Sequence, residues 1–152
     1  MRLTSFTDYS LRVLTYLGLR DDRLATIREI SGAFGVSENH LMKVIYKLGK
    51  LGYIETVRGR GGGMRLAGDP AQINLGKVVR QVEPDFAIVD CFDDERRSDC
   101  VIHPACRLQT LLGEALGAFL GVLDRHTLAD ILKNPKKLNS LLGIEMTGGK
   151  CA

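Results

Sequence analysis

Three cysteines lie close together in the second half of this 152-residue chain. Eight residues separate Cys91 from Cys100, and five separate Cys100 from Cys106. Thiolates are the ligands of iron-sulfur clusters and of zinc, and three in such a short stretch can converge without help from distant segments. His103 lies between the last two cysteines and keeps a Cys3His zinc site open. Cys151, near the C-terminus, is expected to be a loose thiol.

The segment around these cysteines is acidic. Residues 83–99 contain seven carboxylates against Arg96 and Arg97. A loop with few apolar anchors needs a metal to hold its shape, which argues against three unrelated thiols. A thiol enzyme would need a general base close to its cysteine. Of the three histidines, His40, His103 and His126, only His103 is close in sequence, and no catalytic frame is recognisable, so the chain is not expected to be an enzyme.

The net charge of +3 is unevenly divided. Residues 1–70 carry 11 Lys and Arg against 7 Asp and Glu, whereas residues 71–152 carry 10 against 11. Within residues 37–65, six cations face only Glu38 and Glu55. The first half can therefore meet a polyanion, which the acidic loop would repel.

The elements that must position these groups follow from periodicity and caps. We expect a first helix over residues 4–20 and a second that begins at the capping box of Thr26 and stops at Gly35. Ser37 caps a third helix, and strands 53–58 and 64–66 form a hairpin around a glycine-rich tip. This order predicts a mainly α protein with a winged helix-turn-helix.

The third helix would present its polar face to DNA. Asn39 and His40, near its N-terminus, can reach base edges, and three lysines can contact phosphates. The glycine tip between Arg58 and Arg60 is slim enough to enter a minor groove. The outward face of the helix also carries Tyr46. The predicted DNA-binding residues are Ser37, Asn39, His40, Lys43, Lys47, Lys50, Arg58, Arg60, Gly61 and Gly62. The alternative is a solvated helix face and a hairpin that merely turns.

Beyond the wing, a short helix over 74–82 ends at Pro84, and a long helix spans 107–124. Its Leu108, Leu112, Ala115, Phe119 and Val122 form a coiled-coil seam, and Leu111, Leu116, Leu120 and Leu123 form a second strip, so it can pack on its own domain and on a partner. A last helix is expected over 127–133. The predicted organisation is a DNA-binding region at 1–83, a cluster-binding loop at 84–106, a dimerisation helix and C-terminal helix at 107–143, and a flexible tail at 144–152.

Composition agrees with one soluble domain, since 45% of the residues are hydrophobic and 26% charged. The longest uncharged apolar stretch, residues 115–123, is too short to span a bilayer, and no signal peptide is evident. We therefore expect a cytoplasmic location and no contact with a membrane.

Three motifs together carry a family resemblance. They are LTSFTDYSLRVLTYL from Leu3, GVSENHLMKVIYKLGKLGYIETVRGRGGGMRL from Gly35, and CVIHPACRL from Cys100 with Cys91 ahead of it. Together they resemble the NsrR-type nitric-oxide-sensing repressors, winged-helix regulators that hold an iron-sulfur cluster. The likeness extends to about Gly143. The longer first gap between cysteines also approaches the rhizobial iron regulators, which respond to iron.

The resemblance implies that Cys91, Cys100 and Cys106 bind one cluster per subunit. A four-iron cluster is favoured over a two-iron cluster. Regulators of iron-sulfur assembly use a histidine three residues after the last cysteine as fourth ligand, but here that position is Gln109. In NsrR-type members an aspartate of the partner's first helix can serve instead, and the matching residue is Asp8.

Two residues keep alternatives open. Asp8 can also form an ordinary ion pair with Arg12, four residues later. His103 has no ligand role in the family pattern and is expected to make a hydrogen bond within the loop.

The implied protein is a homodimer that represses transcription at a palindromic operator and releases it when nitric oxide attacks the cluster. The alternatives are an iron-responsive iron-sulfur regulator and a constitutive DNA-binding protein stabilised by zinc.

Overall fold

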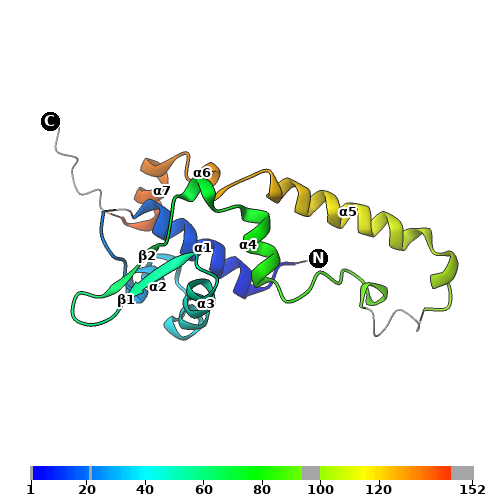
Figure 1. Cartoon of the computed structure of the whole chain (residues 1–152), viewed down its shortest axis with the longest axis horizontal. Helices are drawn as coiled ribbons and strands as arrows, with labels where there is room; N and C mark the ends of the chain where they lie inside the picture. The colour runs from blue at the N-terminus through cyan, green and yellow to red at the C-terminus, as the bar shows by residue number, and fades with distance from the viewer. Residues whose placement is uncertain (1, 21, 94–99, 145–152) are drawn as a thin grey trace.

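The computed structural model describes residues 2–20, 22–93 and 100–144, so the predictions for Cys151 and for most of the tail lie outside it (Figure 1). The described part is mainly helical with one small sheet, as predicted. The helices are α1 (Ser5–Leu19), α2 (Ile27–Phe34), α3 (Glu38–Lys50), α4 (Leu75–Val82), α5 (Arg107–Asp124), α6 (Leu128–Ile131) and α7 (Pro135–Leu142), the strands are β1 (Ile54–Val57) and β2 (Gly63–Leu66), and the short 3-10 turns are η1 (Pro70–Gln72), η2 (Asp90–Phe92) and η4 (His103–Ala105).

Side-chain caps fix the helix-turn-helix made by α2 and α3. The Thr26 side chain accepts from the Glu29 amide and the Glu29 carboxylate accepts from the Thr26 amide, so the predicted capping box is confirmed. Hydrogen bonds from Arg23 and Thr26 lower the pKa of Glu29 to about 2, although burial acts in the opposite direction. Gly35 ends α2 in the left-handed region at φ 64°.

The wing is the two-stranded hairpin β1–β2. Its strands pair antiparallel from Ile54 opposite Leu66 to Val57 opposite Gly63. At the tip, Gly59 and Gly61 have φ of 100° and 77°, a backbone conformation that favours glycine. A Cβ on Gly62 would lie 2.3 Å from the Val57 carbonyl oxygen. The glycine run is therefore required by the turn itself.

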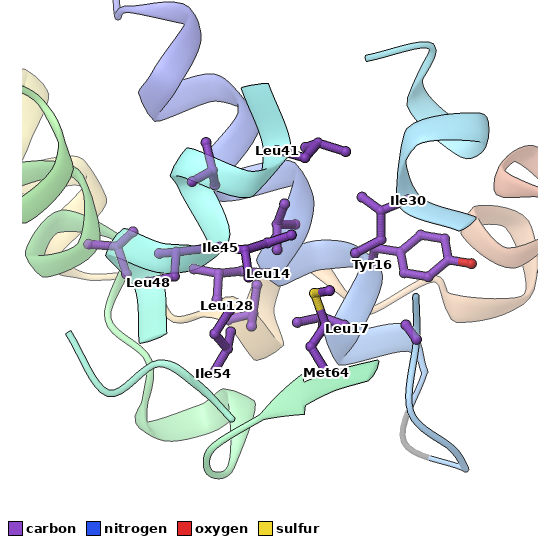
Figure 2. Close-up of a cluster of buried hydrophobic side chains, with 14 of the residues drawn as sticks. Leu14, Tyr16, Leu17, Ile30, Leu41, Ile45, Leu48, Ile54, Met64 and Leu128 are labelled. Carbon is purple, nitrogen blue, oxygen red and sulfur yellow. The ribbon is translucent and has the colours of Figure 1, made fainter. Parts of the chain in front are cut away.

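The hydrophobic core is built around α1, which packs against α3. Leu14 and Leu17 of α1 are buried together with Leu41 and Leu48 of α3. Figure 2 shows Ile54 and Met64 of the wing strands and Leu128 of α6 in the same cluster of side chains. Helix α3, the wing and α1 thus share one core, so α1 cannot move without changing its packing against α3.

Helix α5 begins and ends where the sequence predicts, and Figure 1 shows it extending away from the rest of the protein. Its C-terminal end is joined to α4, where Arg80 Nη2 donates to Asp124 Oδ2 at 2.8 Å and lowers the pKa of that carboxyl. Of the second apolar strip, only Leu123 packs against the core. Helix α5 thus packs on its own domain at this end, as predicted, through Leu123 and its contacts with α4.

The single helix expected over 127–133 is wrong in part. Helix α6 is one short turn, and a further helix that was not predicted, α7, begins at Pro135. Proline is favoured in the first turn of a helix because its missing amide has no partner there anyway. In the described residues, no helix has the length and apolar character needed to cross a membrane.

Candidate functional site

The outward face of α3 carries the predicted DNA-contacting side chains. Asn39, Lys43, Lys47 and Lys50 are exposed, and His40 is exposed at the edge of the face. The opposite face is buried, with Leu41, Val44, Ile45 and Leu48 in the core. Ser37 is exposed too, but its Oγ accepts from the His40 amide at 3.4 Å. Ser37 is thus the N-cap of α3, and the cap fixes the first turn from which the Asn39 and His40 side chains project.

The wing adds cations beside this face. Arg58, Arg60 and Gly61 are exposed, and Gly62 is half-buried in the turn. Arg65 is different, since its Nη2 lies 3.0 Å from Glu55 Oε2 across the hairpin. Within residues 2–20, 22–93 and 100–144, no ion pair involves the three lysines of α3, Arg58 or Arg60. Their charge remains available to a polyanion.

A series of contacts runs from Asp8 on α1 to the first turn of α3. Arg12 Nη2 lies 2.8 Å from Asp8 Oδ2, which is the predicted i,i+4 ion pair. The Arg12 guanidinium lies 6.0 Å from the ring centroid of Tyr9 and 5.7 Å from that of Phe34. The Tyr9 ring is stacked on His40 with 6.3 Å between centroids and 28° between planes.

Sequence reasoning had missed this role of Tyr9. Its helical spacing with Phe6 and Val13 marked it as part of the apolar stripe of the first helix. The only available signal was its polar hydroxyl within that stripe, which is not specific.

Glu83 holds the N-terminus of α1, a role that no sequence pattern predicted. Its carboxylate accepts from the Thr4 amide at 3.1 and 3.2 Å, from the Thr4 hydroxyl at 3.1 Å, and from the Thr7 hydroxyl. Thr7 is fully buried. Because Glu83 directly follows α4, this cluster ties the start of the cysteine-bearing segment to the helix that carries Asp8.

The three cysteines are free thiols at separate places along the loop. Cys91 lies in η2 and Cys106 directly precedes α5, both half-buried, whereas Cys100 is exposed. In the part of the chain that the structure describes, no three His, Cys, Asp or Glu side chains gather closely enough to hold a metal ion. The structure therefore does not bring the predicted ligands together within one chain.

The chemistry of the donor set nevertheless fits a cluster that is completed by another ligand. Three unpaired thiols supply three thiolates, which leaves a fourth position. Gln109 Nε2 donates to the Cys91 carbonyl oxygen at 3.3 Å, so its amide acts on the backbone of a cysteine. The His103 amide donates to the Cys100 carbonyl at 3.0 Å, and its Nε2 is buried with no hydrogen-bond partner among the described residues. The backbone of His103 therefore makes a loop hydrogen bond, but its side-chain Nε2 makes none within the described part of the chain.

Comparison with known proteins identifies the class to which this arrangement belongs. The profile of the Rrf2 family, described as an iron-dependent transcriptional regulator, matches residues 3–134. The chain belongs to the Rrf2 family of transcriptional regulators. It is therefore a DNA-binding regulator and not an enzyme.

Curated relatives support an NsrR-type regulator within this family, as the motifs predicted. The HTH-type transcriptional regulator NsrR of Bacillus subtilis is 54% identical over 143 residues, which are 93% of this chain and 97% of that protein. NsrR of Geobacillus kaustophilus is 53% identical, with the same coverage of 93% and 97%.

Solved structures support the winged-helix fold. A transcriptional regulator from Listeria innocua is 30% identical, covers 88% of each chain and has a TM-score of 0.70. IscR of T. potens is 23% identical, covers 98% of this chain and 94% of its own, and has a TM-score of 0.71. CymR, the global cysteine regulator of B. subtilis, is 23% identical, covers 86% and 95%, and has a TM-score of 0.65. Regulators named for different tasks share this fold, so the signal must be argued from the residues.

Proposed function

We propose that this chain is a homodimeric repressor that senses nitric oxide through an iron-sulfur cluster. Cys91, Cys100 and Cys106 of one subunit and Asp8 of the partner subunit would hold the cluster. When bound, the cluster supplies iron that reacts with nitric oxide. The observation that carries the proposal is the series of contacts from Asp8 to His40 on the recognition helix.

The ion pair of Asp8 with Arg12 is weak enough to be exchanged. Both side chains are over two-fifths exposed, at 46% and 42%. An exposed i,i+4 pair contributes only about 0.3–0.5 kcal/mol, so a metal ligand bond outweighs it. Asp8 can therefore alternate between Arg12 and the cluster at little cost to the fold.

Arg12 carries this exchange to the recognition helix. Its guanidinium lies over Tyr9 and Phe34, so a guanidinium that is released from Asp8 would shift against these two rings. Tyr9 is stacked on His40, and His40 follows Asn39 in the first turn of α3. Residues in this turn are the ones that reach base edges, where small displacements lower affinity. Losing a bias of about 3 kcal/mol would weaken DNA binding roughly a hundredfold.

The state of α5 supports the dimer. None of its 18 residues is buried in the single chain, and Leu108 and Leu111 are 59% and 60% exposed. An apolar helix of this length needs a partner surface, and a second copy of α5 offers a self-complementary one. Two-fold symmetry would present two α3 helices to a palindromic operator about one helical turn apart.

Leu111→Glu tests this interface. We expect light scattering to give a dimer for the wild type and a monomer for the variant. A variant that stays dimeric would place the interface elsewhere.

The signal is tested by a mobility shift of operator DNA with anaerobic holo-protein. One series is titrated with nitric oxide and a parallel series with an iron chelator. Loss of binding with nitric oxide alone supports the proposal. Comparable loss on mild iron withdrawal would assign the chain to iron-responsive regulation instead.

The route through Tyr9 is tested with Tyr9→Leu and, as matched control, Tyr9→Phe. Both variants are expected to keep the cluster absorption spectrum. The leucine variant loses the ring stack, so the ratio of DNA affinities with and without the cluster should fall towards one. The phenylalanine variant keeps the ring and should keep the ratio. An unchanged ratio in Tyr9→Leu would refute this route.

A structural zinc site is the second candidate, and the buried, unpartnered Nε2 of His103 favours it. Cys91, Cys100, Cys106 and His103 are ordinary zinc ligands. Metal analysis separates the two cases, because protein purified without air would be brown with acid-labile sulfide in one and colourless with zinc in the other.

A further inference from the structure

A shallow apolar groove separates α3 from the wing. Its volume is about 700 Å³, and its walls include Met42 and Tyr46 of α3 and Ile54 and Met64 of the strands. Met42 is 54% exposed and Tyr46 is 65% exposed. Among described residues before 83, the only other exposed large apolar residue is Val57, at the end of β1. The exposed apolar surface of the winged domain thus gathers beside the recognition helix.

These two side chains contribute little to the fold. They lie on the solvent side of α3, opposite the buried stripe that holds the helix to α1. Met42 and Tyr46 are four residues apart, so they stand one above the other on the helix surface. An apolar pair kept in water at this position is explained by a partner that covers it.

Cations surround the pair. Lys43 and Lys47 lie on the same helix, Lys50 and Arg58 line the groove, and the Lys50 ammonium lies 4.8 Å from the Tyr46 ring centroid. An apolar protein segment would have to desolvate these charges without compensation. A polyanion that offers small apolar groups would not. In the major groove of DNA, the only apolar group on a base edge is the C5-methyl of thymine.

We propose that Met42 and Tyr46 contact thymine methyl groups in the major groove and thereby determine part of the operator sequence. The inference rests on the proposed binding of operator DNA by α3. Asn39 lies on the same outward face, and asparagine pairs with adenine. Adenine and thymine belong to the same base pair, so these three residues together select A·T pairs in each half-site.

The experiment uses full-length holo-protein prepared without air. A duplex is first selected from a random-sequence library by binding to this protein. Each thymine of the selected duplex is then replaced by deoxyuridine, which removes only the methyl group and keeps base pairing. We expect the dissociation constant to rise about fourfold for each contacted methyl group and to stay unchanged at the other positions.

Side-chain variants assign each contact. Met42→Ala and Tyr46→Ala should each abolish the deoxyuridine effect at one thymine. Once the side chain is truncated, removing the methyl group that it contacts no longer changes the affinity. Tyr46→Phe should keep the effect, since the ring remains. Leu141→Ala removes a 72% exposed apolar side chain on α7 and should keep every deoxyuridine effect.

Several results would overturn the inference. One is equal affinity for the thymine and deoxyuridine duplexes, and another is a penalty that persists in both alanine variants. If Tyr46→Phe abolishes the deoxyuridine effect as fully as Tyr46→Ala does, the hydroxyl makes the contact and the role given to the ring is wrong. Failure to enrich any duplex would contradict DNA binding itself, and this outcome is distinct from the others.

Discussion

Helix α1 is held at its first turn by the Glu83 carboxylate, and Glu83→Ala is expected to destabilise the winged domain. The variant removes the acceptor of the Thr4 amide, the Thr4 hydroxyl and the Thr7 hydroxyl. Hydrogen bonds to a charged group contribute about 1.5–3 kcal/mol each, and a buried polar group left without a partner costs about 1–3 kcal/mol.

The loss is expected to be smaller than the sum of these contributions, because the half-buried amide and hydroxyl of Thr4 can form hydrogen bonds with water instead. Thr7 is fully buried and cannot, although Thr4 Oγ1 lies 3.3 Å from its hydroxyl. We therefore expect a loss of about 2–4 kcal/mol in the free energy of unfolding, or a melting temperature lower by about 4–16 °C. Glu83→Gln keeps one acceptor oxygen and should lose about half as much, part of it from the missing charge at the helix N-terminus.

Urea titrations of the metal-free protein, all at the same protein concentration, measure this loss in the free energy of unfolding. Glu55→Ala is the matched control, since it removes the same type of side chain from an exposed pair with Arg65. Exposed pairs contribute at most about 1 kcal/mol, so this control should unfold almost like the wild type. Equal unfolding free energies for Glu83→Ala and Glu55→Ala would refute the argument that burial makes the Glu83 cluster important.

Three further predictions follow from single residues. Gly62→Ala is expected to weaken DNA binding about tenfold in a mobility shift. The added Cβ would lie 2.3 Å from a backbone oxygen and displace the wing, and a loss of about 1.4 kcal/mol in binding free energy gives this factor. Gly68→Ala is the control and should bind normally, because its Cβ meets nothing within 4 Å. The pKa of Glu29 is about 2 in the folded protein against an ordinary 4.5, so its carboxylate stabilises the fold above about pH 4.5 and this contribution disappears as the pH falls towards 2. In urea unfolding, Glu29→Gln should reduce by about 1 kcal/mol the fall in the free energy of unfolding as the pH decreases. A variant with the same pH profile as the wild type would contradict this role of Glu29. Asp8→Ala should shorten the lifetime of the cluster absorption. Adding Gln109→His to this variant should restore the lifetime, because residue 109 already contacts Cys91. Equal decay of the single and double variants would argue against Asp8 as a ligand.

Under the proposed function, the contacts from Asp8 to His40 connect the cluster to the DNA-binding surface. The helix-turn-helix and wing require only the shared core. The pair Asp8 and Arg12 and the stack of Tyr9 on His40 add a route that starts at an exposed carboxylate. A regulator that lacks this carboxylate would keep the DNA-binding surface and lose the proposed connection to the cluster.

Local features of the site were predictable from the sequence. The capping box at Thr26, the stop at Gly35, the bounds of α5 and the glycine tip of the wing all agree with the structure. Each depends on residues within one or two turns of each other, where spacing and φ preference decide the conformation. The metal-binding loop was predicted from the chemistry of its thiols, and it stays a prediction because the described residues of one chain do not bring the three cysteines together.

Only the tertiary structure revealed which distant residues meet. The sequence separation between Glu83 and Thr7 is 76 residues, and no local pattern predicts that contact. Tyr9 looked like an ordinary core residue until α3 placed His40 against its ring. Met42 and Tyr46 became a distinct surface only when the wing folded beside α3. Most of the helices, the turns and the charge on each face could be predicted from the sequence, because they arise from neighbours along the chain; the division of the C-terminal region into α6 and α7 could not. Which faces meet was decided by the closure of the shared core, because contacts between distant segments depend on how the whole chain packs.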